Sequence, residues 1–406
     1  MLLLTTHALE YFLWFLVFSW LVSIIMTVYG LSREDLTAPP NATEMKTPYA
    51  PLISIIVPCR NEADRILSAA IRSILDQDYR HFEVIAINDR STDATGEILK
   101  ALAEADRRLR VIEGAEPPAG WLGKPYAMHQ ALTQARGEWI LATDADMIFH
   151  PTALRAALAH ATAKQADAIT LIPFFETASF WERVMIPAWA WVLTIFAIVY
   201  RIDDPKSSGA LGIGGFFLMR RAVLDRIGGY HRLRDEVMED VRLAEMIKRS
   251  GASLRVEHAP ALLRTRMYRN FREMWESGTK TWFSGMKFSL LFAVVCALWM
   301  YLMAIVPLAI TVAALIGFAT AAGPTFARLI LAGTLAWLGQ VIVLAMSGMR
   351  SRVSPVYALT APLGLGLLYT MLLDSGIRIR TGRGVTWKGR MIYERAGVAP
   401  PNLKAQ

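Results

Sequence analysis

The sequence predicts an α/β protein with a mostly parallel sheet in its middle and hydrophobic membrane segments at both ends. Short β-branched runs such as residues 52–58 alternate with amphipathic helical stretches up to residue 256. This alternation is typical of a parallel sheet covered by helices on both faces. Long apolar runs flank the region, and hydrophobic residues make up 54% of the 406 residues, whereas soluble domains have about 45–50%. Polar motifs directly follow several of the expected strands.

The net charge and the cysteine content indicate which kinds of partner and which redox compartment to expect. The formal net charge is +8, and part of the Lys and Arg excess lies beside hydrophobic segments. This placement favours anionic lipid and phosphate over nucleic acid, so no nucleic-acid partner is expected. The two cysteines, Cys59 and Cys296, form no framework pattern, and nothing suggests an oxidising compartment.

The first hydrophobic segment predicts a retained membrane helix over residues 1–30. The apolar run over residues 8–29 is about long enough to span a bilayer. No Lys or Arg precedes Arg33 and no convincing cleavage site follows, which argues against a signal peptide. Arg33 and Lys46 favour a cytoplasmic location for the side that follows. Residues 31–51, with four prolines, are expected to be a linker.

The middle of the chain predicts six strands that alternate with helices, with a glycine-rich segment before the last strand. The strands are expected over residues 52–58, 82–87, 110–112, 139–143, 168–172 and 253–256, and the helices over 62–75, 95–105, 124–135 and 152–163. Residues 209–230 are expected to form a glycine-rich turn, a strand and a short helix. Ligands bind beyond the carboxyl ends of such strands, where residues 58–62, 88–93 and 143–146 fall, so one site is expected there.

Two acidic residues follow the strand that ends near Thr143. If that strand continues, Asp144 and Asp146 share one face. Close carboxylates repel each other unless a cation lies between them. Mg²⁺ prefers such oxygen ligands, usually shared with substrate phosphates. These residues alone fit either a divalent metal site or a solvated polar turn.

Residues 180–200 predict a helix lying in the membrane interface. After Arg183 the run is apolar for about one helix length, and it contains Trp189 and Trp191. It is barely long enough to span a bilayer, and a crossing would separate the later polar motifs from Asp144. Tryptophans anchor helices at the interface, which favours that location. An ordinary buried helix is the alternative.

The region over residues 288–376 predicts further membrane helices, and residues 377–406 form a basic tail. Hydrophobic segments cover residues 290–318, 326–346 and 356–373. Arg350, Arg352 and the tail should be cytoplasmic. The last segment contains Pro362, so it is expected to re-enter or to lie in the interface rather than to cross. Residues 387–390, WKGR, fit a juxtamembrane anchor or a part of the site.

Five motifs together resemble a known family. VPCRNE, NDRSTD, GWLGK, TDAD and MED resemble, in order and spacing, the inverting family 2 glycosyltransferases with a GT-A fold. The resemblance covers about residues 52–287. The membrane ends, residues 275–283 and the WKGR tail look most like the branch that glycosylates lipids, which includes hopene-associated, carotenoid-type and ceramide-type glycosyltransferases. It implies a multi-pass protein of the cell (inner) membrane with a cytoplasmic GT-A catalytic domain.

The resemblance implies roles for the residues that match its motifs. Pro58, Arg60, Asn61 and Glu62 would cradle the nucleoside, Asp89 would contact the base with Asp93 as a supporting acid or helix cap, and Lys124 would face the diphosphate. Asp144 and Asp146 would hold Mg²⁺ or Mn²⁺ against that diphosphate. A solvated surface lysine is the alternative for Lys124.

The MED motif implies the catalytic base. Asp240 would remove the proton of the acceptor hydroxyl, although spacing alone does not separate it from Glu239. Acidic residues at a helix start also suit simple capping. His231 nearby is expected to be structural.

One departure from the family concerns its Gln-x-x-Arg-Trp motif, which many processive members carry and this sequence lacks. Residues 276–282 stand in its place, where Lys280 could supply positive charge and Trp275 or Trp282 an aromatic surface. The departure favours a single transfer to a lipid over the synthesis of an extruded polysaccharide.

The expected function is transfer of a sugar, with inversion, from a nucleotide-diphosphate sugar to a membrane lipid at the cytoplasmic face. A polyprenyl-phosphate glycosyltransferase or a short-chain polysaccharide synthase is the alternative among enzymes. A non-catalytic membrane transporter or scaffold with a degenerate nucleotide-binding domain is the alternative of another class, and the full set of acidic residues argues against such decay.

Overall fold

The computed structural model describes residues 2–37, 50–202, 204, 206–320 and 323–392. The chain divides into two compact units. The helical unit comprises Met1–Arg33, Thr177–Val199 and Tyr268–Val385, and the sheet unit comprises Glu34–Glu176, Tyr200–Met267 and Thr386–Gln406. Most of the expected linker, residues 38–49, and the end of the basic tail, residues 393–406, lie outside the described residues.

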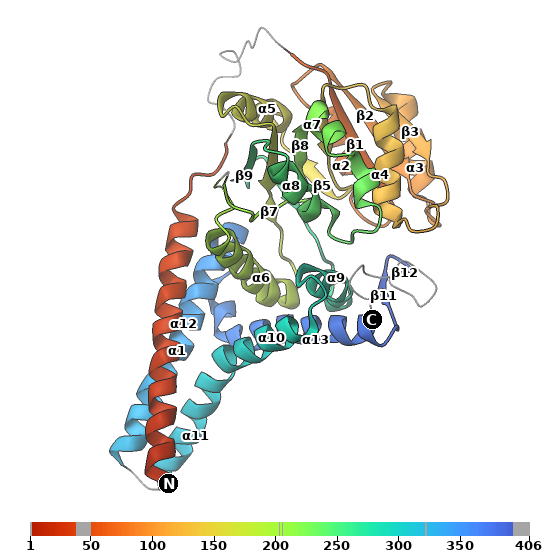
Figure 1. Ribbon diagram of the computed structural model, residues 1–406. Coiled ribbons are helices and arrows are strands. Elements are labelled where there is room, and N and C mark those ends of the chain that lie inside the picture. Colours follow the sequence, from red (N-terminus) through yellow and green to blue (C-terminus); the bar gives the residue numbers. More distant parts are fainter. Residues whose placement is uncertain (1, 38–49, 203, 205, 321–322, 393–406) are drawn as a thin grey trace. The chain divides into compact units, whose positions relative to one another are not determined.

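The sheet unit is built on a seven-stranded sheet of order β3-β2-β1-β4-β8-β6-β9 (Figure 1). Its strands are β1 Ile53–Cys59, β2 Phe82–Asn88, β3 Leu109–Glu113, β4 Trp139–Ala142, β6 Ala168–Ile172, β8 Phe217–Arg220 and β9 Leu254–His258. Only β8 runs antiparallel to its neighbours, so the prediction of a mostly parallel sheet is confirmed. A smaller sheet joins β5 Met147–Phe149, β10 Leu263–Thr265 and β7 Phe174–Phe175.

The helices of the sheet unit follow the predicted alternation. They are α2 Leu67–Leu75, α3 Thr95–Ala105, α4 Gly123–Gln134, α5 Ala153–Ala163, α7 Arg221–Arg226, the 3-10 helix η1 Gly229–Leu233 and α8 Glu239–Arg249. The first was expected from Glu62, but it begins at Leu67. The backbone N–H of Glu62 donates to the hydroxyl of Thr95 instead, at 2.8 Å, and turns fill residues 63–66.

Each face of the large sheet has its own buried core. Ile55 of β1 belongs to the same buried cluster as Ile71 of α2. The next residue, Ile56, belongs to the cluster that contains Met128 of α4. This alternation follows from the two-residue period of a strand. Because β1 is apolar on both faces over these positions, polar side chains concentrate at the strand ends.

A buried carboxylate ties the start of the sheet together. The hydroxyl of Ser54 donates to Glu83 Oε1 at 2.7 Å, and Arg136 Nη2 donates to Glu83 Oε2 at 2.8 Å. Arg110 adds a third donor at 3.1 Å. Burial opposes ionisation, but the hydrogen bonds from Arg136 and Ser54 outweigh it and lower the pKa of Glu83. The ion pair therefore links β1, β2 and the approach to β4.

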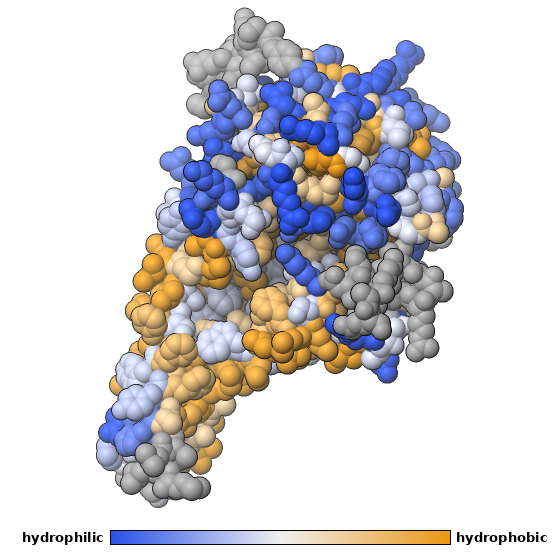
Figure 2. Space-filling view, in the orientation of Figure 1, coloured by the Kyte–Doolittle hydropathy of each residue, from blue (hydrophilic) through white to orange (hydrophobic). Residues whose placement is uncertain are grey.

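The helical unit consists of apolar helices, the more polar helix α9 and short 3-10 turns. They are α1 Leu2–Leu31, α6 Phe180–Val199, α9 Phe271–Gly285, α10 Leu290–Ala304, α11 Val306–Thr320, α12 Pro324–Gly348, η2 Met349–Ser351, η3 Pro355–Thr360 and α13 Ala361–Arg380. In the part of the chain that the structure describes, five stretches are long and apolar enough to cross a membrane: His7–Leu31, Phe180–Val199, Leu290–Thr320, Pro324–Ser351 and Pro355–Arg380. Figure 2 shows a largely hydrophobic surface on this unit and a more hydrophilic surface on the sheet unit.

Two of these stretches bear on the membrane predictions. Residues 180–199 form the predicted helix, and its location in the interface stays a prediction. α13 continues through Gly364 and Gly366 without a break, because Pro362 lies at its first turn, where a proline is tolerated. Whether the last segment crosses or re-enters stays a prediction.

Glycines bring α1 close to its neighbours. A Cβ on Gly339 of α12 would lie 2.6 Å from Cβ of Trp20, which is fully buried. A Cβ on Gly30 would lie 2.5 Å from Cγ2 of Thr194 on α6. Small residues allow such close approach between membrane helices. α1 is therefore an integral part of the helical unit.

Candidate active site

The loops after β1 and β2 form one connected surface. Pro58 lies within β1, and Arg60, Asn61 and Glu62 follow its end. Asn61 has a left-handed backbone (φ 50°), and its Oδ1 accepts a hydrogen bond from the backbone N–H of Thr92 at 2.9 Å. Because β1 and β2 are parallel neighbours, both loops leave the same edge of the sheet, as predicted.

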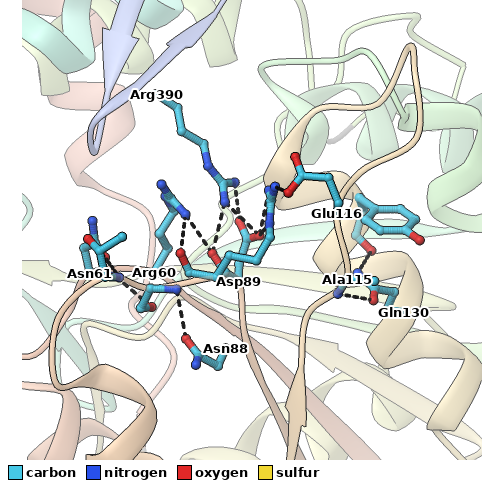
Figure 3. Close-up of polar contacts among 12 residues, drawn as sticks. Arg60, Asn61, Asn88, Asp89, Ala115, Glu116, Gln130 and Arg390 are labelled. Atoms are coloured by element: carbon cyan, nitrogen blue, oxygen red, sulfur yellow. Dashed lines mark hydrogen bonds and ion pairs between the residues drawn. The ribbon is translucent and has the colours of Figure 1, made fainter.

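Asp89, directly after β2, is surrounded by arginines (Figure 3). Arg390 Nη1 donates to Asp89 Oδ2 at 2.8 Å, and Arg90 Nη2 donates to Oδ1 at 3.2 Å. Arg60 Nη1 donates to the backbone carbonyl of Asp89, also at 2.8 Å. Burial and the nearby charge of Arg390 lower the pKa of Arg60. The cluster therefore gathers positive charge beside the residue expected to contact the base.

The WKGR residues enter this cluster through a tight turn. β11 Val385–Trp387 and β12 Arg390–Ile392 pair with each other, and we call residues 386–392 of the sheet unit the tail hairpin. Lys388 (φ 46°) and Gly389 (φ 75°) are both left-handed, as a two-residue hairpin turn requires. Lys388 forms an ion pair with Glu62.

The sequence left the role of this motif open and did not include Lys388 or Arg390 among the site residues. The structure brings both into contact with predicted site residues, Glu62 and Asp89. The available signal was a Lys-Gly turn followed directly by Arg390, the first residue of β12. Its partner acids lie more than 300 positions earlier, so sequence spacing could not reveal the pairing.

The glycine of GWLGK has a steric role in the same place. A Cβ on Gly123 would lie 2.2 Å from Arg390 Nη1 and 3.0 Å from Asp89 Oδ2. Real Cβ contacts essentially never fall below about 3 Å, so any side chain here would displace Arg390. Gly123 thus lets the start of α4 approach the Arg390–Asp89 pair.

Lys124, the next residue, lies among carboxylates. Its Nζ is 2.8 Å from Asp144 Oδ1 and 2.7 Å from Glu239 Oε1. Although burial disfavours the ammonium charge, the charges of Asp144, Glu239 and Asp240 raise the pKa of Lys124 well above its usual value. The structure therefore brings together three motifs that are far apart in the sequence.

Asp144 and Asp146 lie in a turn between β4 and β5. β4 ends at Ala142, so the argument that the two residues share one face of an extended strand is wrong. The turn nevertheless leaves the two carboxylates near enough to interact, and burial together with the charges of Asp144 and Glu62 raises the pKa of Asp146 to about 6. Arg65 Nη1 lies 2.9 Å from Asp146 Oδ2.

This pair fits a divalent cation only with help from a ligand. A cation between the two carboxylates would relieve their repulsion. Within the described residues, no group of three or more His, Cys, Asp or Glu side chains forms a complete metal-binding set. Asp144 and Asp146 can therefore supply part of a coordination shell, and the oxygens of a bound diphosphate suit the remainder.

Asp240 lies at the start of α8. Its Oδ2 accepts a hydrogen bond from Gly214 N at 2.8 Å, and its Oδ1 accepts one from Val241 N at 2.8 Å. Burial and the charge of Glu239 raise the pKa of Asp240 to about 6. A Cβ on Gly214 would lie 3.2 Å from Asp240 Oδ2 and 3.4 Å from Asp144 Oδ2, so both carboxylates approach this glycine.

A small cavity lies where these groups meet. Its lining comprises Lys124, Met128, Ala142, Thr143, Asp144, Gly214, Phe217, Tyr230, Glu239, Asp240 and Leu243. The cavity thus combines two possible bases with a cation and one of the two possible metal ligands.

Three other residues named from the sequence lie elsewhere in the fold. Lys280 and Trp282 are on α9 of the helical unit, so the site described above does not include them, and their assignment stays a prediction. The ring of His231 lies 5.6 Å from that of Trp121, in keeping with the expected structural role.

The chain is similar in sequence to known glycosyltransferases. Residues 54–228 match the model of the family described as Glycosyl transferase family 2. The chain is 31% identical over 118 residues to Glycosyltransferase GlyG of Streptococcus pneumoniae, covering 29% of this chain and 38% of that protein. It is 26% identical over 246 residues to the Beta-monoglucosyldiacylglycerol synthase of Synechocystis, covering 58% of this chain and 50% of that protein.

A solved structure supports the fold. The mannosyltransferase PcManGT from Pyrobaculum calidifontis, determined in complex with GDP-Man and Mn²⁺, superposes with a TM-score of 0.52 at 17% identity. The match covers 91% of this chain and 98% of that one. It establishes the GT-A-like fold. Since the chain spans half or less of the length of both curated relatives, it does not follow that the whole protein shares their activities.

Proposed function

We propose that this chain, whose residues 54–228 match the glycosyl transferase family 2 model, is an inverting glycosyltransferase that acts on a membrane lipid. It takes a sugar from a nucleotide-diphosphate donor and passes it to the acceptor at the cytoplasmic face of the cell (inner) membrane. In this proposal residues 52–287 are the catalytic region, and residues 1–30 and 288–376 hold it at the membrane.

The observation that carries the proposal is the convergence of Lys124, Asp144 and Asp240 on one cavity. Asp240, once ionised, accepts the proton of the acceptor hydroxyl while that oxygen attacks the anomeric carbon. The bond to the diphosphate breaks on the opposite side, and the diphosphate leaves with the electron pair. The ammonium of Lys124 places positive charge beside the departing group.

The choice between the two acids of the motif follows from their partners. Glu239 is held by Lys124 at 2.7 Å, so its charge is already compensated. In the part of the chain that the structure describes, the carboxylate of Asp240 accepts hydrogen bonds from two backbone N–H groups, each at 2.8 Å. A carboxylate whose pKa lies at about 6 is suited to act as a base near neutral pH. We assign Asp240 as the base and Glu239 as a positioning residue.

Asp144 and Asp146 would hold a divalent metal, Mg²⁺ or Mn²⁺, which would stabilise negative charge on the leaving diphosphate. The chain's own contribution is to hold these carboxylates at the end of β4, with Arg65 on Asp146 and Lys124 on Asp144. The Mn²⁺ of the mannosyltransferase complex supports this assignment.

The donor nucleotide would lie over the loops after β1 and β2. Asn61 and Glu62 shape that surface, and Asp89 offers a carboxylate to a base N–H. Arg60 and Arg390 add positive charge beside it. Lys388 and Arg390 join the residues that we assign to the nucleotide, and Lys280 and Trp282 remain candidates for binding the donor.

A lipid acceptor is supported by the helical unit and by one relative. Five apolar stretches in the described residues could bring a membrane-embedded acceptor within reach. The Synechocystis relative is named as a synthase of a glucosyl diacylglycerol. The sequence also lacks the Gln-x-x-Arg-Trp motif of processive members. Together these points favour a single transfer over the polyprenyl-phosphate and polysaccharide alternatives.

The test is mass spectrometry of total lipids from cells with the wild-type chain, with Asp240→Asn, and without either. The wild type should produce a lipid heavier than its precursor by one sugar, and Asp240→Asn should not. A ladder of several sugars would favour the polysaccharide alternative. If no donor is hydrolysed or transferred by the purified wild type with metal present, the proposal fails and a non-catalytic scaffold takes its place.

A further inference from the structure

The helical unit contains a small cavity of its own, between α6, α12 and η3. Its lining comprises Arg183, Val184, Pro187, Leu344, Ala345, Val353, Ser354, Tyr357 and Ala358. Arg183 is the only charged side chain in this set. The cavity therefore places one cation in an otherwise largely apolar pocket.

Arg183 has no acidic partner within the described part of the chain. Its Nη1 donates to the hydroxyl of Tyr357 at 2.9 Å, and its guanidinium carbon lies 5.4 Å from the centroid of that ring. Both contacts orient the guanidinium, but neither neutralises it. A guanidinium has five N–H donors in a planar fork that matches phosphate oxygens. An uncompensated charge at a largely apolar site is costly, and an anion removes that cost.

The surface around the cavity suits lipid chains. Large apolar side chains are exposed on α6, η2, η3 and α13, which carry lining residues or adjoin them in the sequence, namely Phe180, Met349, Val356, Leu359 and Leu363. The ring of Phe180 also lies 6.1 Å from that of Tyr357. Aromatic rings beside an arginine near the ends of apolar helices are typical of the headgroup level of a membrane.

We propose that this cavity binds the phosphate of a membrane phospholipid, with Arg183 as its anion ligand and Tyr357 as the residue that orients Arg183. The acyl chains would lie along the exposed apolar side chains. The bound lipid would fix α6 against α12 and η3. This site is separate from the glycosyl-transfer chemistry, and no bond is made or broken in it.

The lining explains why the lipid is held rather than glycosylated. It contains no Asp, Glu or His, so no side chain there could remove a proton from an acceptor hydroxyl. The two possible bases, Glu239 and Asp240, line the other cavity. A phospholipid phosphate needs no deprotonation, because it is already anionic at neutral pH.

The test is native mass spectrometry of the full-length protein in mild detergent, titrated with phosphatidylglycerol and, separately, with diacylglycerol. We expect the wild type to retain phosphatidylglycerol in preference to diacylglycerol. Arg183→Gln should weaken phosphatidylglycerol binding by about tenfold, since it removes a charge-assisted, bidentate contact. Arg183→Lys should be intermediate because it keeps the charge but loses the fork. The matched control is Arg272→Gln, an exposed arginine of α9 that pairs with Glu276.

Three results would overturn the proposal. They are equal retention by Arg183→Gln and the wild type, an equal loss in Arg272→Gln, or equal binding of the two lipids to the wild type. If Arg183→Gln does not fold, the same titration is done with Arg183→Lys and Tyr357→Phe. Wild-type affinity for phosphatidylglycerol in both variants contradicts the site. A raised KM for the lipid acceptor with unchanged phosphatidylglycerol binding would assign the cavity to the acceptor instead. Because the readout needs no nucleotide sugar, failure of the proposed transferase activity leaves this result intact.

Discussion

The guanidinium of Arg390 holds the carboxylate of Asp89 across 301 positions of the chain, with Nη1 2.8 Å from Oδ2. A second nitrogen of Arg390 lies 3.1 Å from the backbone carbonyl of Asp89. One guanidinium therefore fixes both the side chain and the backbone of the loop after β2. The tail hairpin is thus part of the candidate nucleotide site.

Arg390→Gln should raise the KM for the donor by about tenfold, because a charge-assisted hydrogen bond and one positive charge are lost where a diphosphate is expected. The kcat should change much less, since Arg390 does not line the cavity that holds Asp240. Initial rates at varied donor concentration measure both. Arg383→Gln, an exposed arginine of the same tail, is the control, and an unchanged KM in Arg390→Gln would contradict the role.

Gly123→Ala should reproduce this effect without altering any charge. The added Cβ would lie 2.2 Å from Arg390 Nη1, so the end of that flexible side chain must move away from Asp89. Stability should fall only slightly, because a side-chain tip can shift at low cost. The double variant with Arg390→Gln should be no worse than either single variant. Additive losses in KM would show that Gly123 acts in some other way.

The kcat/KM for transfer should rise with pH through about 6, because burial and the charge of Glu239 raise the pKa of Asp240 to about 6. A base acts only when deprotonated, so activity should fall about tenfold per pH unit below that value. Asp146 has a pKa raised to a similar value, and metal competes with its proton. The profile is therefore measured at saturating metal. If the loss of activity at acidic pH disappears at saturating metal, the titrating group is Asp146, and the assignment to Asp240 is contradicted.

Removal of divalent metal with EDTA should lower transfer at least about 100-fold, and added Mg²⁺ or Mn²⁺ should restore it. The reason is that, without a cation, the negative charge of the leaving diphosphate would face the carboxylates of Asp144 and Asp146 with no metal to compensate it. Asp144→Asn should lose activity and should not recover at any metal concentration. Asp78→Asn, which removes the exposed ion pair of Asp78 with Arg155, is the control. Full activity in EDTA would remove the metal from the proposal.

Glu83→Ala should lower the free energy of unfolding by about 2–4 kcal/mol, since it leaves the buried hydroxyl of Ser54 and the backbone N–H of Arg136 without their acceptor. Denaturant unfolding followed by tryptophan fluorescence measures this loss. Hydrogen bonds from Arg136 and Ser54, working against burial, lower the pKa of Glu83 in the folded state. The contribution of Glu83 to the free energy of unfolding is therefore present above its unfolded-state pKa. It is lost as pH falls through its folded-state pKa. The difference between wild type and Glu83→Gln should shrink at acidic pH, and a constant difference would contradict this explanation.

Much of the sheet unit could be predicted from the sequence, because its signals are local. The strand over residues 168–172 and the helix over residues 95–105 were predicted with the bounds that the structure has. Both predictions depend on the spacing of apolar residues within a short stretch of sequence. The start of α2 was misplaced because turns fill residues 63–66. Contacts that hold this stretch, such as that of the Glu62 N–H with the Thr95 hydroxyl, join segments far apart in the sequence and have no local signal.

The candidate site was predicted in its parts but not in its connections. Motifs at strand ends gave the positions of Asp89 and Asp144, since parallel strands deliver them to one edge, and the MED motif of the family resemblance gave Asp240. The pairing of Lys124 with Glu239 depends on how α4 and α8 pack, and that of Arg390 with Asp89 on the path of the tail hairpin. Neither has a local signal. The extended geometry assumed for Asp144 and Asp146 failed because β4 ends at Ala142.

The close packing of Trp20 against Gly339 means that α1 is not an interchangeable anchor. A generic leucine-rich span of equal length would keep the protein at a membrane. It would, however, lack the indole that fits against Gly339 and the glycine at position 30 that accommodates Thr194. A chimera with such a span should reach the membrane and still have a disordered helical unit. Targeting and assembly, usually treated as one task of an N-terminal helix, would then separate.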